Sequence, residues 1–483
     1  MNYAALLASV AGYAGIATDD RDVRAGFVFV PGGGARAERD AYVARAVARG
    51  AAVVVAEEAL RGAAGGATFV AVDDVREATA DLAAAHYGHP ARTMQMIGIT
   101  GTCGKTTTTY LLEAILTAGG HRVGALGTVS YRFPGHERPA TNTTPGPVAL
   151  QALLAEMRDA GCTAVVMEVS SHALKQKRVR GVPFDAGVFL NFSSEHLDYH
   201  HTLEDYFESK ALLFTTCADE ARAAGKVLVP VLNAADPAVA ELVARLRAAG
   251  GAPRVFGDEP ATFGPEGVAV TVDGRVYTCG LVGRFNAENV TASVRTACAL
   301  GVAPDAIQRG LDGLAQVPGR LDRVADARGA HLFVDYAHKP GALENILVTL
   351  RELAGEHRLA VVFGCGGDRD QVKRPVMGEI AARLADAVWV TSDNPRTENP
   401  DAIVAAILEG MPRTDHVRVD VDRRAAIRDA VAWAGPGDVL VVAGKGPEPY
   451  QIVADPAAPG GTRTLPFDDR VEVAAAVMAA PGR

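Results

Sequence analysis

The chain lacks the features that mark disulfide-bonded, zinc-binding or membrane-spanning proteins. Its six cysteines include no CxxC pair, and this spacing fits neither a zinc cluster nor a disulfide framework. No apolar run is long enough to span a bilayer, and residues 1–17 have neither a basic start nor a cleavage-site pattern. We therefore expect reduced thiols, no membrane partner and a cytoplasmic protein.

Positive charge is also in deficit. The chain has 48 Lys and Arg against 57 Asp and Glu, a formal net charge of -9. That balance argues against a general nucleic-acid or membrane-surface binder, although it leaves room for a local basic pocket that takes a small anionic ligand. We expect no nucleic-acid partner.

What is present describes a globular α/β protein of several domains. With 483 residues, 48% apolar and 22% charged, the chain is too long for one ordinary core, and about three domains are expected. We predict a small N-terminal α/β domain over residues 1–92, a central parallel-sheet domain over 93–322 and a C-terminal Rossmann-like domain over 323–483.

Short apolar runs bounded by turn residues locate the strands. The Asp273-Gly274 dipeptide, between two alternating runs, suits a type I′ hairpin turn. The predicted strands cover residues 28–31, 52–56 and 68–72, then 94–99, 164–169, 186–191 and 227–232, then 332–335, 360–363, 387–391 and 439–443, with the hairpin at 268–272 and 275–279.

A glycine loop between an apolar strand and a helix predicts nucleotide binding. It runs Gly101-Thr102-Cys103-Gly104-Lys105-Thr106-Thr107, and Gly98 lies six residues before Gly104, one more than in a strict Walker A sequence. Successive backbone N–H groups and the helix N-terminus face phosphates in such loops, Lys105 neutralises charge and Thr106 reaches a magnesium ion. By itself the loop indicates only a nucleotide.

Two polar clusters follow other predicted strands. Glu168 lies in Met-Glu-Val-Ser-Ser-His, and His196 lies in Asn-Phe-Ser-Ser-Glu-His-Leu-Asp-Tyr-His. Because strands of a doubly wound parallel sheet end at one edge, both clusters are expected beside the glycine loop. Carboxylate and imidazole groups are metal ligands, so Glu168 and His196 are candidate magnesium ligands.

The order GTCGKTT, MEVSSHAL, NFSSEHLDYH and then Lys210 in EDYFESKALLF resembles the Mur ligase family over nearly the whole chain. The segments NAADP, GRFNAEN, PGR, DYAHKP and FGCGGDRD follow in the family's order. The resemblance implies that the central domain, residues 93–322, is a P-loop-type parallel-sheet ATPase domain. It implies an ATP-dependent, ADP-producing amide-bond-forming ligase. It further implies that Lys210 is carbamylated and joins Thr106, Glu168 and His196 in holding Mg²⁺, with Lys105, Glu168, His196 and Lys210 as the catalytic set.

For the nucleotide, the resemblance adds residues beyond the loop. It places Asn286 or Asn289 near adenine, Arg320 at the phosphates and Asp335 at the ribose. His338 and Lys339 either touch the γ-phosphate or have a helix-capping or surface role.

For the amino acid, two segments resemble those of the family members that add meso-diaminopimelate. They are TSDNPRTE, with Asp393, Asn394, Pro395 and Arg396, and GKGPE, with Gly444 and Glu448. Arg396 and Arg369 are suited to bind the distal carboxylate of diaminopimelate through charge-assisted bonds, and Glu448 to bind its ammonium. Lysine would leave these arginines without an anion, a penalty of several kcal/mol.

The acceptor expected from the resemblance is a UDP-muramoyl dipeptide. Its implied ligands are Thr143, Thr144, Ser170, Gln176 and Arg178, with Asp20 in the first domain, where serine is usual. A carboxylate beside a pyrophosphate is unfavourable unless it turns away or pairs with Arg21. Cys103 and Pro447 are milder departures from the family pattern.

These expectations combine into one interpretation: a monomeric ligase that uses ATP and Mg²⁺ to join diaminopimelate to a UDP-muramoyl dipeptide through an acyl phosphate. Two alternatives stay open. One is a Mur-ligase paralogue that acts on a different carboxylate acceptor or amino acid. The other is a nucleotide-binding protein without ligase activity, which the presence of Lys105, Glu168, His196 and Lys210 disfavours.

Overall fold

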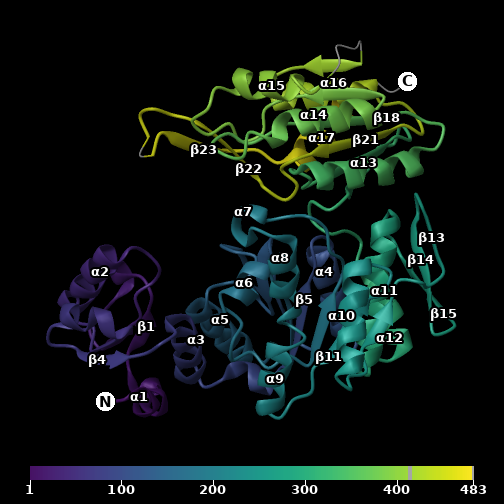
Figure 1. The fold of residues 1–483 in the computed structure, drawn as a ribbon. Helices are drawn as coiled ribbons and strands as arrows, with labels where there is room; N and C mark the ends of the chain where they lie inside the picture. Colours follow the sequence, from purple (N-terminus) through teal and green to yellow (C-terminus); the bar gives the residue numbers. More distant parts are fainter. Residues whose placement is uncertain (412–415, 459, 481–483) are drawn as a thin grey trace. The chain divides into compact units, whose positions relative to one another are not determined.

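The computed structural model describes residues 1–411, 416–458 and 460–480, which divide into two compact units (Figure 1). The first comprises Met1–Pro260, Thr271–Arg275 and Glu288–Gly313, and the second comprises Ala261–Val270, Val276–Ala287 and Leu314–Arg483. Both units are built on mainly parallel sheets with helices on their faces, and antiparallel strands such as β7, β8 and β16 lie at the sheet edges, so the predicted α/β class is confirmed. The three predicted domain boundaries stay a prediction.

The N-terminal part of the first unit is a four-stranded parallel sheet. Its apolar strands are short, and helices pack on both of its faces. The strands, in spatial order, are β1 (Gly15–Ala17), β2 (Phe27–Phe29), β3 (Val53–Ala56) and β4 (Thr68–Ala71). The helices are α1 (Tyr3–Ser9), η1 (Val10–Gly12), η2 (Asp20–Asp22), α2 (Arg36–Ala48), η3 (Glu58–Ala64) and α3 (Val75–His86).

An eight-stranded sheet forms the rest of the first unit, in the order β12-β11-β10-β5-β9-β6-β7-β8. Its strands are β5 (Gln95–Thr100), β6 (Val123–Leu126), β7 (Ser130–Phe133), β8 (His136–Pro139), β9 (Ala164–Glu168), β10 (Ala186–Phe189), β11 (Val229–Asn233) and β12 (Arg254–Phe256). Strands β5, β9 and β10 are almost wholly buried, which explains their continuous apolar runs.

Helices cover both faces of this sheet. One face packs against α5, α8, α9 and α10, and the other against α4 and α11. The helices of this part are η4 (Pro90–Thr93), α4 (Lys105–Ala118), α5 (Pro147–Asp159), α6 (Ser171–Lys175), α7 (Leu197–His200), α8 (Leu203–Ala211), α9 (Thr216–Ala223), α10 (Pro237–Ala248), α11 (Arg284–Ala299) and α12 (Pro304–Gly313).

The strand that carries the glycine loop lies between the two strands that carry the polar clusters. Ile99 of β5 is opposite Glu168 of β9, and Thr100 of β5 is opposite Phe189 of β10. All three strands are parallel, so their carboxyl ends meet at one edge of the sheet. The predicted gathering of the loop and both clusters at this edge is confirmed.

A three-stranded sheet contains the predicted hairpin, with the order β13 (Ala261–Gly264), β14 (Gly267–Val272) and β15 (Arg275–Cys279). Asp273 has φ 50° and Gly274 has φ 79°. A type I′ turn requires positive φ at both central residues, so the predicted turn is confirmed.

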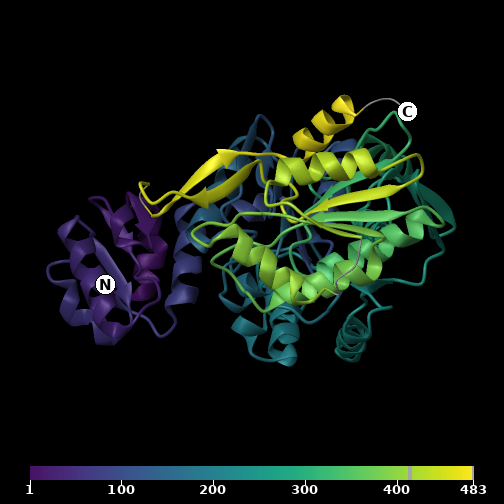
Figure 2. The same ribbon diagram turned by 90° about the horizontal axis from the view of Figure 1, so that it is seen from above.

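The second unit is built on a six-stranded sheet in the order β16-β17-β21-β18-β19-β20, parallel except for the edge strand β16. Helices lie on both sides of it (Figure 2): α13 and α14 against one face, α16 and α17 against the other. Its strands are β16 (Asp322–Val324), β17 (His331–Asp335), β18 (Leu359–Phe363), β19 (Ala387–Val390), β20 (Val417–Val419) and β21 (Val439–Ala443).

The helices of the second unit follow its strands in turn, as a Rossmann-like alternation requires. They are α13 (Pro340–Ala354), α14 (Lys373–Leu384), α15 (Pro400–Leu408), α16 (Arg423–Trp433) and α17 (Asp469–Ala479). An antiparallel ribbon of β22 (Tyr450–Ala454) and β23 (Thr462–Pro466) was not predicted. In the described ranges we find no helix whose length and apolar character would let it cross a membrane.

Candidate active site

The glycine loop joins β5 to α4 and depends on glycine at its last position before the helix. Gly104 has φ 86°, and a Cβ there would lie 2.3 Å from the Oδ1 atom of Asn289. Thr108, one turn into α4, also donates to this Oδ1 atom at 3.4 Å. Asn289 therefore packs directly against the loop, in agreement with its expected place at the nucleotide. The alternative, Asn286, is buried and donates its Nδ2 to the Val282 carbonyl at 2.8 Å.

Two lysine amines converge on one carbonyl of the loop. Lys105 Nζ donates to the Gly101 oxygen at 2.7 Å and to the Thr102 oxygen at 2.9 Å. Lys210 Nζ, from α8, donates to the same Gly101 oxygen at 2.9 Å, although its side chain is 2% exposed. Burial, and then the charge of Lys105, lower the pKa of Lys210 well below its ordinary value. Lys210 is thus less readily protonated than an exposed lysine.

Tyr206, which the sequence did not single out, connects this lysine pair to the loop. Its hydroxyl is 3.3 Å from the Thr102 hydroxyl, and its ring lies 4.5 Å from Lys210 Nζ and 6.0 Å from the His196 ring. Burial raises the pKa of this phenol. In the sequence, Tyr206 is marked only by its place one helical turn before Lys210. A tyrosine that simply packs in the core could occupy the same place.

Glu168 is fixed by hydroxyl and backbone donors. Its Oε1 accepts from the Thr106 hydroxyl at 3.0 Å and from the Thr128 N–H at 2.9 Å, and its Oε2 accepts from the Thr128 hydroxyl at 3.0 Å. Magnesium prefers oxygen ligands and is bound by one or two carboxylates together with substrate phosphates. The Thr106 hydroxyl and the Glu168 carboxylate therefore fit a magnesium ion beside the glycine loop.

His196 lies in a group of aromatic rings. Its ring is 4.9 Å from the His172 ring, and its Nε2 is 3.6 Å from the Glu195 carboxylate. His172 also stacks on Tyr199 at 4.1 Å, and burial lowers its pKa. In the described ranges no cluster of three or more His, Cys, Asp or Glu side chains has the arrangement of a metal site. A site with His196 would thus need hydroxyl, lysine-derived or substrate ligands.

The residues expected at the acceptor share one hydrogen-bond network. The Thr144 hydroxyl donates to the Glu168 carbonyl at 2.9 Å and accepts from the Ser170 N–H at 3.1 Å. Arg178 donates to the Thr144 carbonyl at 2.9 Å and to Gln176 Oε1 at 2.7 Å. Thr143 joins through Thr128, hydroxyl to hydroxyl, at 3.1 Å. This network reaches the candidate metal ligand Glu168 in two ways: through Thr144 at the Glu168 carbonyl, and through Thr128 at the Glu168 carboxylate.

Asp20 has a partner that the sequence did not indicate. Its buried carboxylate pairs with Arg45 at 2.7 and 2.9 Å, while Arg21 pairs with Asp19 at 2.6 Å. The Arg45 guanidinium holds the pKa of Asp20 below its usual range. Of the two arrangements that the sequence left open, the carboxylate turns away, to Arg45, and does not pair with Arg21.

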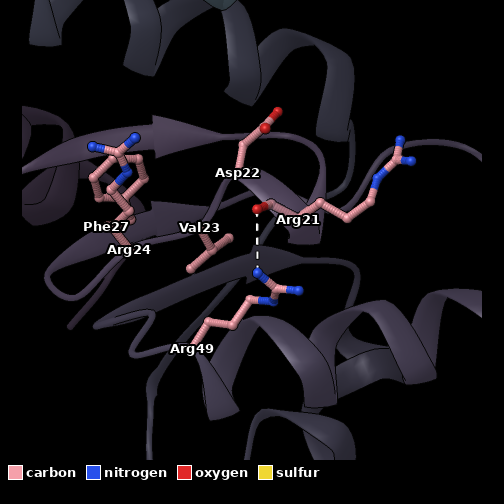
Figure 3. A pocket seen from close by; sticks show the side chains of 6 residues that line it. All are labelled: Arg21, Asp22, Val23, Arg24, Phe27 and Arg49. Carbon is pink, nitrogen blue, oxygen red and sulfur yellow. Dashed lines mark hydrogen bonds between the residues drawn. The ribbon is translucent and has the colours of Figure 1, made fainter.

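A cavity of about 460 Å³ opens beside this segment. Its lining residues are Arg21, Asp22, Val23, Arg24, Phe27 and Arg49 (Figure 3). Arg49 donates to the Arg21 carbonyl at 3.3 Å, and the three guanidinium groups point in different directions. They do not converge on one anion, and Asp22 adds a negative charge, so this cavity is not assigned to the acceptor.

In the second unit, Asp335 is held by the chain around it. Its Oδ2 accepts from the Leu321 N–H and its Oδ1 from the Ala337 N–H, both at 2.8 Å, and burial raises its pKa. Arg320 lies 5.2 Å from the centre of the Tyr336 ring. Asp335 therefore anchors the loop that carries Arg320, with both oxygens already occupied by backbone donors.

His338 and Lys339 lie at the start of α13. Burial lowers the pKa of His338 to about 4, so its imidazole is neutral near pH 7, and its Nδ1 lies 2.8 Å from the Tyr336 carbonyl. Lys339 is the N-cap residue of α13 but makes no side-chain capping bond.

The expected amino-acid residues meet at the carboxyl ends of β19 and β21. Lys445, fully buried, donates to Asn394 Oδ1 at 2.8 Å and to Asp393 Oδ1 at 3.3 Å. Glu448 accepts from Asn394 Nδ2 at 2.9 Å and from the Tyr336 hydroxyl at 3.2 Å, and burial raises its pKa. The sequence analysis did not assign a role to Lys445, although its position within the GKGPE segment could have indicated one.

Two arginines flank the same loop. Arg396, at φ 54°, donates Nη1 to the Gly367 carbonyl at 2.7 Å. A Cβ on Gly366 would lie 2.9 Å from this Nη1 and 3.8 Å from Arg369 Cγ. Both arginine side chains therefore approach Gly366, Arg396 with its guanidinium and Arg369 with its aliphatic stem. Forked guanidinium groups are suited to binding a carboxylate through paired hydrogen bonds.

Replacing Gly104 with alanine should weaken ATP binding about tenfold or more, because the left-handed backbone costs roughly 1–2 kcal/mol and the new Cβ meets Asn289. The KM for ATP and the affinity for a fluorescent ATP analogue would measure it. Gly120→Ala is the matched control, since Gly120 has φ 92° but open space around its Cβ. Equal ATP affinity in both variants would contradict the assignment.

Lys210→Met should raise thermal stability in carbon-dioxide-free buffer. The folded pKa of Lys210 is depressed, so the unfolded state binds its proton more tightly and wild-type stability rises with pH up to the ordinary lysine pKa. The Tm advantage of the variant should therefore be largest near neutral pH and shrink as pH rises towards 10. Differential scanning calorimetry across pH 7–10 would test this, and a pH-independent difference would refute it.

A strand, a glycine loop and a lysine-bearing helix beside a strand-end carboxylate define a phosphate-loop nucleotide-binding protein. Residues 99–297 match the Mur ligase middle domain, and residues 319–446 match the Mur ligase glutamate ligase domain. The chain belongs to the Mur ligase family.

Similar proteins agree over almost the full length. A UDP-N-acetylmuramoyl-L-alanyl-D-glutamate–2,6-diaminopimelate ligase from Geobacter metallireducens is 46% identical, covering 96% of this chain and 93% of the relative. A protein of the same name from Gloeobacter violaceus is 44% identical, covering 95% and 92%. A solved structure of a ligase of this name matches with TM-score 0.69 and 31% identity, covering 97% and 95%. MurF ligase from Thermotoga maritima in complex with ADP shares the fold, with TM-score 0.61, 20% identity and coverage of 91% and 94%.

Proposed function

We propose that this chain is an ATP-dependent ligase that adds meso-diaminopimelate to UDP-N-acetylmuramoyl-L-alanyl-D-glutamate during peptidoglycan precursor synthesis. The near full-length likeness to diaminopimelate ligases supports the activity. The observation that carries the choice of amino acid is the pair of arginines beside Gly366, together with Glu448 on the neighbouring loop. Diaminopimelate has a carboxylate and an ammonium at its distal end. The arginines offer a positive charge to the carboxylate, and Glu448 offers a negative charge to the ammonium.

The first step joins the acceptor to phosphate. An oxygen of the D-glutamyl γ-carboxylate attacks the γ-phosphorus of ATP, the bond to the β-phosphate oxygen breaks, and ADP leaves. Lys105, the helix N-terminus and the loop N–H groups hold the transferring phosphate, where negative charge accumulates. Thr143, Thr144, Ser170, Gln176 and Arg178 hold the muramoyl dipeptide, and the N-terminal domain receives the uridine nucleotide.

In the second step the amine of diaminopimelate attacks the acyl carbon, phosphate leaves and the nitrogen loses a proton. Asp393, Asn394, Pro395, Arg396, Arg369, Gly444 and Glu448 hold the amino acid so that its amine faces the acyl group. Asn289 or Asn286, Arg320 and Asp335 hold ATP.

Magnesium ions bound by Thr106, Glu168, His196 and Lys210 would neutralise phosphate charge. For Lys210 we propose carbamylation: the unprotonated amine attacks carbon dioxide and releases a proton, which gives an anionic carbamate whose oxygens can bind a metal ion. The buried position and lowered pKa of Lys210 support this reaction, because only the unprotonated amine is nucleophilic. We propose that the enzyme acts in the cytoplasm as a monomer.

A coupled ADP-release assay tests the proposal. With UDP-muramoyl dipeptide, Mg²⁺ and ATP, we expect release that depends on meso-diaminopimelate and is far slower with L-lysine or other amino acids. Mass spectrometry should show a product that is the sum of acceptor and amino acid less one water. Turnover with another amino acid or acceptor instead would identify a paralogue, and ATP binding without amino-acid-dependent ADP release would refute ligase activity.

A further inference from the structure

The second unit contains an ion pair that is removed from solvent entirely. Arg423 and Asp469, the first residues of α16 and α17, are joined by bonds of 2.6 and 2.8 Å, and both side chains are 0% exposed. Transferring two charges from water costs several kcal/mol per ion, so such a pair is weak evidence for stability. Its remaining hydrogen bonds indicate what else it does.

The Arg423 guanidinium also spans two loops. Its Nη2 donates to the Ala443 carbonyl at 3.0 Å and its Nη1 to the Ser392 carbonyl at 3.3 Å. These carbonyls directly precede Gly444 and Asp393, the first predicted amino-acid ligands of each loop. Strands β19 and β21 are not neighbours, because β18 lies between them. The guanidinium therefore supplies a link between the two loops that the sheet's own hydrogen bonds do not.

The strand between them is shaped to allow this link. Gly364 follows β18, and a Cβ there would lie 2.3 Å from the Thr391 carbonyl oxygen. The backbone after β18 thus passes close beneath the β19 loop. A planar guanidinium with several fixed donors can bind a carboxylate and two carbonyls together, whereas the single ammonium of lysine cannot present the same geometry.

We propose that Arg423 and Asp469 are positioning residues that fix the spacing of the two amino-acid-binding loops, residues 392–396 and 444–448. The inference rests on the proposed function of those loops. Asp469 orients the guanidinium, and the guanidinium holds the loops so that Asn394 and Glu448 keep their mutual hydrogen bond and present one binding surface. Misplacement of such a surface by about 1 Å can cost roughly 100-fold in rate.

The decisive variant is the double substitution Arg423→Met with Asp469→Leu. Apolar replacement of a buried ion pair is commonly neutral or stabilising, so the Tm should stay close to that of the wild type. The two carbonyl contacts are nevertheless lost, and we expect the KM for diaminopimelate to rise about tenfold or more. The KM for ATP and for UDP-muramoyl dipeptide should change less than twofold. A folded double variant with an unchanged KM for diaminopimelate would overturn the proposal.

Two further variants guard against a failure to fold. Arg423→Lys keeps the charge opposite Asp469 but cannot reach both carbonyls, and it should show the same selective rise in KM. Arg358→Met is the matched control, because Arg358 pairs with Asp438 across the amino ends of β18 and β21 in the same sheet. Arg358→Met should alter stability and leave the KM for diaminopimelate unchanged. Equal changes in this KM in Arg423→Lys and Arg358→Met would mean that Arg423 has a structural role only.

The wild-type assay separates the two levels of inference. If wild-type protein releases ADP with an amino acid other than diaminopimelate, the proposed substrate fails, and the same KM comparison is made with the accepted amino acid. If wild-type protein uses diaminopimelate and the variants match it, only the positioning role fails.

Discussion

Replacing Lys210 with alanine is expected to lower kcat by about 100- to 1,000-fold, the usual cost of removing one group that stabilises charge in the transition state. In our proposal the modified lysine supplies an anionic oxygen for metal binding beside Glu168. Alanine removes that oxygen and leaves a cavity at a position that is 2% exposed in the wild type. ADP release under saturating substrates would measure the loss.

The cavity provides a specific rescue. Formate or acetate at millimolar concentration should restore part of the activity of Lys210→Ala, because a carboxylate in the cavity replaces the lost oxygens. Lys210→Met is the matched control, since its side chain fills the space and should not be rescued. Lys226→Ala removes another lysine of the same unit, one that binds the Met94 carbonyl and Asp185, and should keep near wild-type activity. Full activity of Lys210→Ala without added carboxylate would exclude a catalytic Lys210.

Arg396→Met is expected to raise the KM for diaminopimelate roughly 10- to 100-fold, the range for losing a hydrogen bond to a charged group. Only Nη1 of this guanidinium has hydrogen-bond acceptors among the described residues, the carbonyls of Gly367 and Asn394, so its other nitrogens can serve a substrate carboxylate. The KM for lysine, which has no distal carboxylate, should change much less. Discrimination between the two amino acids should therefore fall by a similar factor.

Competition between diaminopimelate and lysine, read by product masses, gives this ratio directly. Arg396→Lys should recover little of it, because an ammonium lacks the forked geometry that matches a carboxylate. Arg418→Met removes an exposed arginine of β20 that pairs with Asp429 of α16, and it should leave the ratio of the two products unchanged. An unchanged ratio in Arg396→Met would assign the distal carboxylate to other residues.

Most of the buried parallel strands could be predicted because their sequences have a single physical explanation. Strands such as β18 and β21 are apolar throughout and are followed by glycine. The strands β1 and β6 are also buried and parallel but were missed, because their apolar runs are short and contain glycine. The antiparallel strands β7, β8, β22 and β23 were also missed. Strands β8, β22 and β23 are partly or fully exposed and their polar residues resemble loops, and β7 is mostly buried but has only four residues, including a serine and an arginine. Their pairing depends on neighbours that local sequence does not reveal.

In the site, motif residues were placed correctly at strand ends, while the residues that orient them were not found. Thr128 and Tyr206 fix Glu168 and the loop through single hydroxyl groups. A threonine after a strand and a tyrosine in a helix are common residue types, and only tertiary structure distinguishes these from others. The same holds for Arg45, which neutralises Asp20 from 25 positions away.

The contact between Gly104 and Asn289 links two segments that leave the ribosome far apart in time. Thr108 and Asn289 are separated by 181 positions, and at about 5–20 residues per second this interval lasts on the order of 10–40 s. During that interval the glycine loop lacks one wall, so a nascent chain arrested before Asn289 should bind ATP weakly. Maturation of this nucleotide site is therefore a late event in biosynthesis, set by the distance along the chain rather than by the loop itself.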